Sequence, residues 1–244
     1  MDKWLGSLNS QKSAWLLMAL CTLALTVCMR SEVGAQELSL EAQTLVERAR
    51  NGDPEAQFRL GFMYFNGEGV PQDLQAAVKW FKLSADQNSP AAQNNLGVCF
   101  RDGKGVPQDD KMAVDWFRRA ANQGHDDAQL NLGWMYENGR GVENDPQEAN
   151  NWYLKSAEQG NARAQNNLGM NYFQGQGIKQ DYIKSLKWLR AAAEQGMAPA
   201  QHQLGWMYHQ GVGVPEDRGE AKKWYKQAAE QGFEQAKRAL NLME

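Results

Sequence analysis

The sequence predicts an all-α protein in which five antiparallel helix pairs stack into a solenoid. The first observation is a period of 36 residues, which carries Leu-Gly, Gly-x-Gly, an aspartate and a tryptophan along most of the chain without insertions. The second is that apolar residues recur every four positions in two segments of each period, as on one face of a helix. A fixed period of this length is typical of a supersecondary unit that buries its apolar face against copies of itself. A tryptophan marks the end of every unit, at Trp80, Trp116, Trp152, Trp188 and Trp224.

Residues 1–35 differ in composition from the rest and predict an export signal. Residues 14–29 form an uninterrupted apolar or small run, which is at the short end for spanning a bilayer core of about 30 Å. Small residues precede Gln36, where signal peptidase would read them. We therefore expect cleavage near Ala35 and a periplasmic or secreted mature chain. The alternative is that the segment is kept, and that residues 14–29 anchor the chain to the inner membrane.

The period also sets the boundaries of the units and leaves a half-unit at each end. Residues 36–53 align with a second helix but have Thr44 in place of the tryptophan, and residues 234–244 align with a first helix but have Asn241 in place of the glycine. Altered half-units are what a finite stack needs at its ends. We therefore expect capping helices at 36–53 and 234–244, and between them five units at 54–89, 90–125, 126–161, 162–197 and 198–233.

The unit at residues 90–125 shows how each helix pair is built. Ser89 before a proline predicts a helix N-terminus, since serine caps the helix and proline is tolerated at its first position. Gly97 has no side chain, and we interpret it as the point where the partner helix comes closest. Gly103 ends the first helix with a residue that tolerates positive φ, and Asp109 caps the second. The recurring aspartates therefore have a structural explanation, and the tryptophans are predicted to pack in the core.

Composition and motifs argue against several classes of function. The net charge is −3 and no basic stripe is present, so we expect no nucleic-acid partner. The Gly-x-Gly turns join helix to helix and lack the preceding strand of a dinucleotide or phosphate loop. His202 and His209 share a helical face without an evident third metal ligand, and Cys99 is interpreted as a small core residue. We therefore predict no catalytic, cofactor-binding or metal-binding residue, no cofactor, no small-molecule substrate and no enzymatic activity.

The repeated string resembles the Sel1-like repeat. It reads Ala-x-x-x-Leu-Gly-x-Met-Tyr, then Gly-x-Gly-Val-x-x-Asp, then Ala-x-x-Trp-Tyr/Phe-x-x-Ala-Ala-x-Gln-Gly, and it is almost complete at residues 128–160 and 200–232. The family is similar to tetratricopeptide repeats, so the resemblance implies a right-handed superhelix that serves as an adaptor between proteins, in bacteria often at the cell envelope. The departures are Asn88-Ser89 in place of Gln-Gly, and Cys99 and Asn171 in place of methionine.

If the first helices line the inner curve, as the resemblance implies, one of their faces forms a groove. The face that carries Leu60 hardly changes between units, whereas the opposite face changes its chemistry in every copy and keeps large aromatic groups. Such a surface suits an extended or helical peptide. The candidate groove residues are Phe58, Phe62, Phe65, Asn94, Arg101, Leu130, Trp134, Glu137, Asn166, Phe173, His202, Trp206 and His209.

Two interpretations of these side chains are open, because a helix in the middle of a stack contacts neighbours on more than one side. They face a groove, or they pack against the preceding second helix. We expect partial exposure for Trp134 and Trp206. We expect polar specificity from Arg101 and Glu137, since a charged group is rarely buried without a partner.

The predicted function is that of an exported scaffold that holds a protein or peptide partner in this groove. A first alternative is a carbohydrate- or peptidoglycan-binding envelope protein, because aromatic rings can stack on sugar faces. A second is a hydrolase, such as a β-lactamase-like enzyme, on the same scaffold. A cysteine-rich branch of the family has been credited with β-lactam binding or hydrolysis, but it carries paired cysteines, whereas the mature chain would keep only Cys99.

Overall fold

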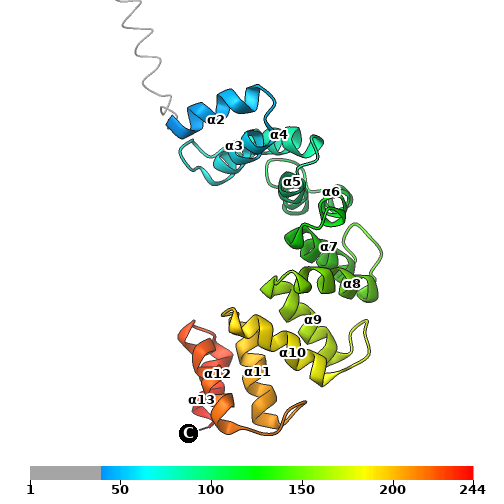
Figure 1. Cartoon of the computed structure of the whole chain (residues 1–244), viewed down its shortest axis with the longest axis vertical. Coiled ribbons are helices and arrows are strands. Elements are labelled where there is room, and N and C mark those ends of the chain that lie inside the picture. The colour runs from blue at the N-terminus through cyan, green and yellow to red at the C-terminus, as the bar shows by residue number, and fades with distance from the viewer. Residues whose placement is uncertain (1–39, 244) are drawn as a thin grey trace, which may run out of the picture.

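The computed structural model describes residues 40–243, and this part of the chain is all-helical (Figure 1). The predicted export signal at residues 1–35 and the alternative anchor at 14–29 lie outside the described residues. Helix α2 (Leu40–Arg50) comes first and helix α13 (Glu234–Asn241) last. The five pairs between them are α3 (Pro54–Asn66) and α4 (Leu74–Asp86), α5 (Pro90–Asp102) and α6 (Asp110–Asn122), α7 (Asp126–Asn138) and α8 (Pro146–Glu158), α9 (Ala162–Gln174) and α10 (Tyr182–Glu194), and α11 (Ala198–Gln210) and α12 (Arg218–Glu230).

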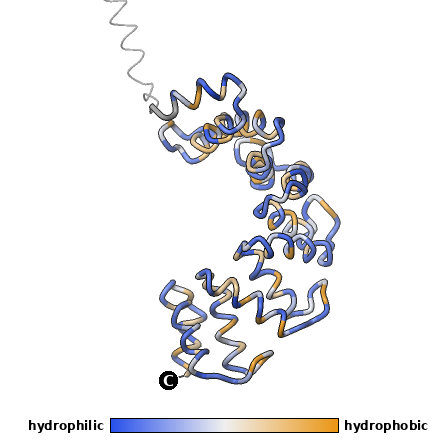
Figure 2. The backbone as a smooth tube through the Cα atoms, in the orientation of Figure 1, coloured by the Kyte–Doolittle hydropathy of each residue, from blue (hydrophilic) through white to orange (hydrophobic). Residues whose placement is uncertain are grey.

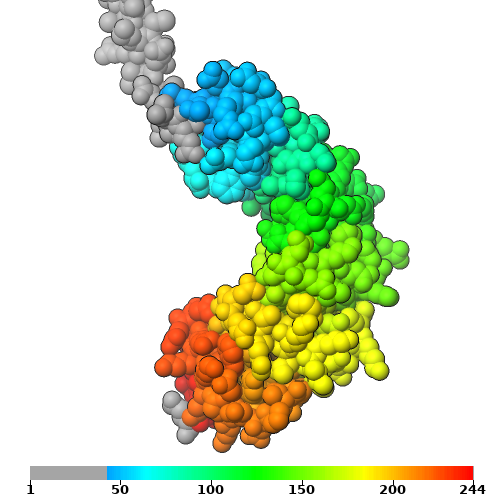
Figure 3. Space-filling model, in the orientation of Figure 1, coloured from blue at the N-terminus to red at the C-terminus, as the bar shows by residue number. Residues whose placement is uncertain are grey.

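The pairs follow one another along an arc, which confirms the predicted α-solenoid. Each first helix packs against the second helix of its own unit, and each second helix against the first helix of the next unit. In Figure 1, α5 and α7 lie on the inner side of the arc and α6 and α8 on its outer side. In Figure 3 the arc is a crescent, hollowed between its two ends. Among residues 40–243, no helix combines the length and the apolar character that crossing a membrane requires.

Hydrophobic and hydrophilic residues are interspersed along the tube in Figure 2, with no long stretch of either kind. The buried apolar side chains accordingly form a row of local clusters, each shared between adjacent helices, and not one central core. Each helix of the five pairs has only 13 residues, a length that is marginal for an isolated helix in water. The helices are therefore stabilised mainly by their neighbours.

The recurring aspartates cap the second helices, as the sequence predicts. Asp109, for example, accepts a hydrogen bond from the backbone N–H of Met112 at 3.0 Å. A cap of this kind contributes about 1 kcal/mol to helix stability. The first helices end at a glycine in the left-handed region, such as Gly103 at φ 68°. The other capping aspartates are Asp53, which begins a first helix, and Asp73, Asp145, Asp181 and Asp217.

The glycine of each Leu-Gly pair is the closest point between the two helices of a unit, which confirms its interpretation from the sequence. A Cβ added at Gly97 would lie 2.7 Å from the Phe117 ring, a distance too short for two carbon atoms. The ring therefore occupies the space that a side chain would need. The same contact recurs in the other units, at Gly61 with Phe81, Gly133 with Tyr153, Gly169 with Leu189 and Gly205 with Tyr225.

The tryptophans behave less uniformly than predicted. Trp116, Trp152 and Trp224 are buried, whereas Trp80 and Trp188 are only partly buried. Basic side chains cover the rings from the solvent side in four units, for example Lys155, whose Nζ lies 3.9 Å from the centroid of Trp152. In each pair the charged group itself lies within the range of a cation–π interaction with the ring. The other three covering residues are Arg119, Lys187 and Lys223.

A row of buried glutamines joins the units, a role that was not predicted from the sequence. In the third unit, Gln129 donates to the carbonyl oxygen of Ala121 at 3.2 Å and accepts from Gln159 at 2.7 Å. One amide thus links α6, α7 and the C-terminus of α8. Since a buried amide without a partner is costly, the residue type is strongly constrained. The equivalent buried glutamines are Gln57, Gln93, Gln165 and Gln201.

The contacts of the buried glutamines correct the alignment of the first unit. The expectation that Asn88-Ser89 replaces Gln-Gly there is wrong by one position, because Gln87-Asn88 occupies the place of Gln-Gly. Gln87 keeps the glutamine role, donating to Gln57 at 2.7 Å. Asn88 takes the place of the glycine, and its φ is 69°. Asparagine tolerates this left-handed conformation better than other residues with a side chain do, so the turn is preserved.

Candidate partner-binding surface

The thirteen candidate groove residues differ widely in accessibility. Phe62 is exposed, with 43% of its surface accessible. Asn94 and Leu130 are buried, with only 8% and 3% of their surfaces accessible. The other ten, Trp134 and Trp206 included, are partly exposed. Neighbouring helices thus cover most of the Asn94 and Leu130 side chains, although Leu130 still lines a hollow of this surface.

Several of the aromatic candidates also pack against a second helix. The rings of Phe58 and Phe65 lie 6.1 and 6.2 Å from that of Phe81, between centroids. Phe173 lies 5.5 Å from Trp206, which belongs to the next unit. These partners lie on the second helix of the same unit, α4, and on the next first helix, α11, so the predicted packing against the preceding second helix stays a prediction. These rings are therefore partly buried in the stack and partly exposed. By the concave surface we mean the surface of α3, α5, α7, α9, α11 and the turns after them.

Glu137 takes part in a network inside the fold. Its Oε2 accepts from the Tyr153 hydroxyl at 2.8 Å and its Oε1 from Asn171 at 3.2 Å. Asn171 also donates to Asn150 at 2.9 Å. Burial raises the pKa of Tyr153, and the nearby Glu137 carboxylate raises it further. Because both carboxylate oxygens are engaged, the structure does not support Glu137 as a specificity group, and Asn171 is explained as part of the same network.

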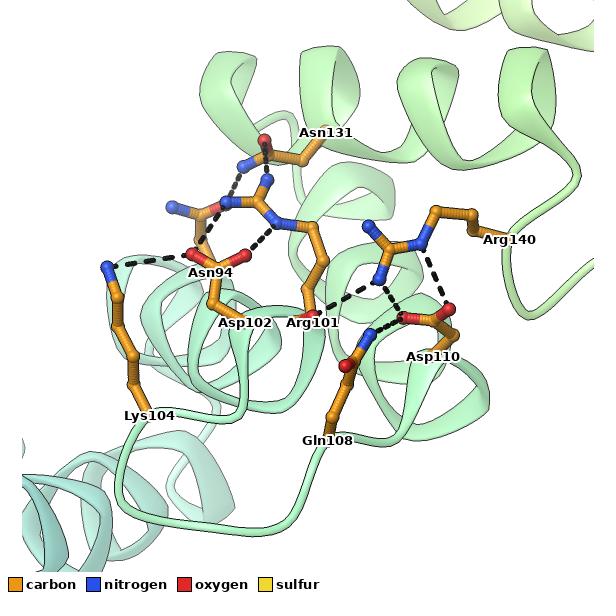
Figure 4. A network of polar contacts seen from close by, with 8 residues as sticks. All are labelled: Asn94, Arg101, Asp102, Lys104, Gln108, Asp110, Asn131 and Arg140. Atoms are coloured by element: carbon orange, nitrogen blue, oxygen red, sulfur yellow. Dashed lines mark hydrogen bonds and ion pairs between the residues drawn. The ribbon is translucent and has the colours of Figure 1, made fainter.

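Polar contacts hold the side chains of Arg101 and Arg140 in place (Figure 4). Arg101 donates to Asp102 at 2.7 and 3.1 Å and to Asn131 at 3.1 Å. Its Cζ lies 5.9 Å from the Trp134 ring centroid, and that of Arg140 lies 5.2 Å from it. Both guanidiniums are thus within the range of a cation–π interaction with one indole.

Arg140 connects two units. It donates to the carboxylate of Asp110 at 2.6 and 3.0 Å and to the carbonyl oxygen of Arg101 at 3.3 Å. The fork geometry of these bonds fixes the guanidinium plane. The Arg140 guanidinium holds the pKa of Asp110 below its usual range, as Arg101 does for Asp102. These carboxylates therefore stay ionised well into the acidic range.

A hollow of about 350 Å³ opens beside this cluster. It is built by three successive units, through the end of α5, the middle of α7, the turn after α7 and the start of α9. Its volume lies at the lower end of the range for ligand sites. The lining residues are Arg101, Asp102, Leu130, Asn131, Trp134, Arg140, Arg163 and Asn167.

A second hollow, of about 660 Å³, lies at the N-terminal end of the concave surface. It is more apolar than the first and contains the exposed ring of Phe62. The residues that line it are Leu45, Glu55, Phe58, Arg59, Phe62, Met63, Glu68 and Gly69.

Sequence reasoning missed the residue between the two glycines of each turn. Glu68 lines the N-terminal hollow and Arg140 the central one. Lys104 lies with its Nζ 5.3 Å from the Phe65 ring centroid, in the preceding unit. The sequence does contain a signal for these residues, because the residue between the two glycines differs from unit to unit while the glycines on either side of it are constant. Asn131 and Asn167 were missed for a different reason: each follows directly after a candidate position, on the same side of its helix.

The side chains of the concave surface are suited to binding a partner, and in the described chain neither Cys99 nor a metal cluster adds a reactive group to them. Cys99 is fully buried and its pKa is raised to about 11, mainly by burial. It is therefore a neutral packing residue at neutral pH, as the sequence predicts. Within residues 40–243, no group of three or more histidine, cysteine, aspartate and glutamate side chains is placed to hold a metal ion.

His202 should make the C-terminal end of the stack sensitive to acid. Its ring lies between Tyr225 and Phe233, at 5.6 and 5.3 Å between centroids, and burial lowers its pKa. The unfolded chain, with an ordinary histidine pKa of about 6.5, then binds the proton first. The stability that this contact contributes is complete above that pH and is lost as the pH falls through the lowered pKa.

Melting temperatures from pH 8 to pH 5 test this expectation. The natural chain should lose more stability on acidification than the His202→Gln variant. Parallel curves for the two proteins would show that the imidazole does not titrate differently on folding.

Paired helices of constant length, stacked in phase around a variable concave surface, define an α-solenoid repeat protein. The family model described as Sel1 repeat matches residues 54–89, 90–125, 126–161, 162–197 and 198–233. The chain belongs to the Sel1 repeat family.

Solved structures agree with this assignment. The chain is similar to c5321, a protective antigen of uropathogenic Escherichia coli strains with an SLR fold, at 39% identity and a TM-score of 0.81, over 85% of this chain and 44% of that one. It is also similar to a Sel1 repeat protein from Oxalobacter formigenes, at 39% identity and a TM-score of 0.72, over 76% of each chain.

One curated relative is a putative sel1-like repeat-containing protein, L18, of Acanthamoeba polyphaga mimivirus. It is 48% identical over 40 residues, which make up 16% of this chain and 7% of that protein. This chain therefore spans less than half of c5321 and a small part of L18.

Proposed function

We propose that this chain is an exported scaffold that binds a segment of a partner protein along its concave surface. Sel1 repeat proteins are protein-interaction modules, and their solenoid is generally a non-catalytic scaffold. The observation that carries the proposal is the contrast between two faces of the first helices. The packing face repeats the same contacts in every unit, while the concave surface presents a different chemistry in each and contains two hollows.

The physical properties of this surface suit a peptide segment. Aromatic and arginine side chains in hollows are the groups that dominate binding energy at protein interfaces. Here they are held by contacts within the stack, so little side-chain freedom is lost when a partner binds. Export is supported by the apolar run at residues 14–29 and the small residues up to Ala35.

Two exposed apolar residues of the first unit provide a matched test. Phe62 on α3 lines the N-terminal hollow, whereas Leu83 on α4 is on the second helix of the same unit, and their exposed fractions are 43% and 48%. Neither substitution by aspartate empties a buried site, so both variants should melt close to the natural chain. We expect Phe62→Asp to lose partner proteins captured from the producing cells, and Leu83→Asp to retain them.

The partners should be identified by mass spectrometry and confirmed with the purified proteins. Equal capture by all three chains, or a loss with Leu83→Asp alone, would contradict binding on the concave surface. A parallel sedimentation with purified sacculi separates the peptidoglycan alternative, since retention on sacculi that depends on Phe62 would favour a glycan ligand.

A further inference from the structure

The central hollow differs from the rest of the concave surface in its charge. Three guanidiniums line it, together with one carboxylate. Two of the three are neutralised within the fold, Arg101 by Asp102 and Arg140 by Asp110. The third, Arg163, is an exposed residue at the second position of α9.

Arg163 makes no hydrogen bond or ion pair with any residue in the part of the chain that the structure describes. Its charge acts on the Tyr153 hydroxyl, where it opposes the larger effect of burial on the pKa of that group. Asp102 is shared between Arg101 and Lys104, whose Nζ lies 3.6 Å from it, so Arg163 is the one guanidinium lining the hollow without an ion-pair partner among the described residues. That charge sits beside the Trp134 ring and two asparagine side chains, Asn131 and Asn167.

We propose that this hollow binds the carboxylate of an aspartate or glutamate side chain from a partner polypeptide, with Arg163 as its ion-pair partner. The inference rests on the proposed function and adds the chemistry of the partner. A guanidinium and a carboxylate form two parallel charge-assisted hydrogen bonds. The Trp134 ring offers an apolar surface for the methylene groups of the acidic residue.

Charge favours a carboxylate over a phosphate. Arg163 is the one guanidinium of the hollow that is free to pair, and a single guanidinium matches a monoanion, whereas a phosphorylated side chain carries nearly two negative charges at neutral pH. The remaining guanidiniums cannot turn toward a second charge without leaving Asp102 and Asp110, because their forks are engaged.

The test is a selection of random 12-residue peptides displayed on phage. The full chain, fixed through a C-terminal tag, is compared with Arg163→Glu and with the matched control Arg218→Glu. Both arginines are exposed in the first turn of a helix, at α9 and α12. An acidic residue there is favoured by the helix dipole, so neither variant should lose stability. We expect the natural chain and Arg218→Glu to enrich peptides with aspartate or glutamate, and Arg163→Glu to lose that enrichment.

Affinities of a selected peptide refine the result. Replacing its acidic residue by the amide should weaken binding to the natural chain by about tenfold, and should have little effect on Arg163→Glu. Acidic enrichment that persists with Arg163→Glu, or selected peptides without acidic residues, would overturn the inference and leave peptide binding intact. A phosphoserine at the acidic position that binds more tightly than the carboxylate would also overturn it. If no peptide is selected at all, the proposed function itself fails.

Discussion

Gly133→Val is expected to lower the free energy of unfolding by about 3 kcal/mol or more, and the melting temperature by roughly 6–12 °C. The first carbon of the new side chain would lie 2.8 Å from two atoms of the Tyr153 ring and 3.1 Å from the carbonyl oxygen of Ala149. Tyr153 is fully buried and its hydroxyl is held by Glu137. The ring has no free space to move into, so α7 and α8 must separate.

Gly219→Val is the matched control for this substitution. Gly219 also lies in a helix, at the second position of α12, and a Cβ there would meet only the Asp217 carboxylate, at 3.3 Å. The two variants share the change in helix propensity and differ in the contact with the partner helix. Melting followed by circular dichroism should show a large loss for Gly133→Val and a small one for Gly219→Val. Similar melting of both variants would contradict the role of the glycine as the closest helix contact.

The helix pairs were predictable because their causes are local and are repeated five times. Asp109 caps a helix in the same way as Asp73, so a pattern seen once is tested by the other copies. Gly97 was identified as the closest approach because every unit places a glycine at that point. Repetition removes the ambiguity that a single glycine or aspartate would carry.

The candidate surface was less predictable, because exposure depends on the neighbouring unit. Helical spacing places Leu130 and Trp134 on the same face, yet the first is buried and the second partly exposed. Glu137 is engaged by Tyr153 and Asn171, of which the second lies in the next unit. Such partners are set by the stacking of one unit on the next, which the period alone does not describe.

The turn glycines show the same division between local and long-range causes. Positive φ explains the first glycine of each Gly-x-Gly turn. The second glycine has a further reason, since it also packs on the preceding unit. A Cβ at Gly141 would lie 2.2 Å from the carbonyl oxygen of Asp110, the first residue of α6. The equivalent contacts are Gly105 with Leu74, Gly177 with Pro146 and Gly213 with Tyr182, each the first residue of the preceding second helix.

Gly141→Ala should therefore weaken the interface between the second and third units, by about 3 kcal/mol or more. The left-handed backbone alone costs a residue with a side chain about 1–2 kcal/mol, and the remainder comes from a clash with backbone atoms, which no side-chain rotation relieves. The substitution also moves Arg140, the neighbour of Gly141 in the chain, away from Asp110 and so alters the central hollow.

Gly124→Ala isolates the backbone term of this prediction, because Gly124 has φ 89° but a Cβ there meets nothing within 4 Å. It should cost only about 1–2 kcal/mol.

In a solenoid, stability is a sum of terms from the units and their interfaces. A weakened interface should therefore divide the cooperative unfolding of the stack. Hydrogen exchange of Gly141→Ala should show lower protection in α6 and α7 than in α11 and α12, whereas Gly124→Ala should keep a uniform profile. Equal losses of stability and of hydrogen-exchange protection in the two variants would contradict this prediction. The Gly141 turn would then not join the second unit to the third, and it would not be what positions Arg140 at the central hollow.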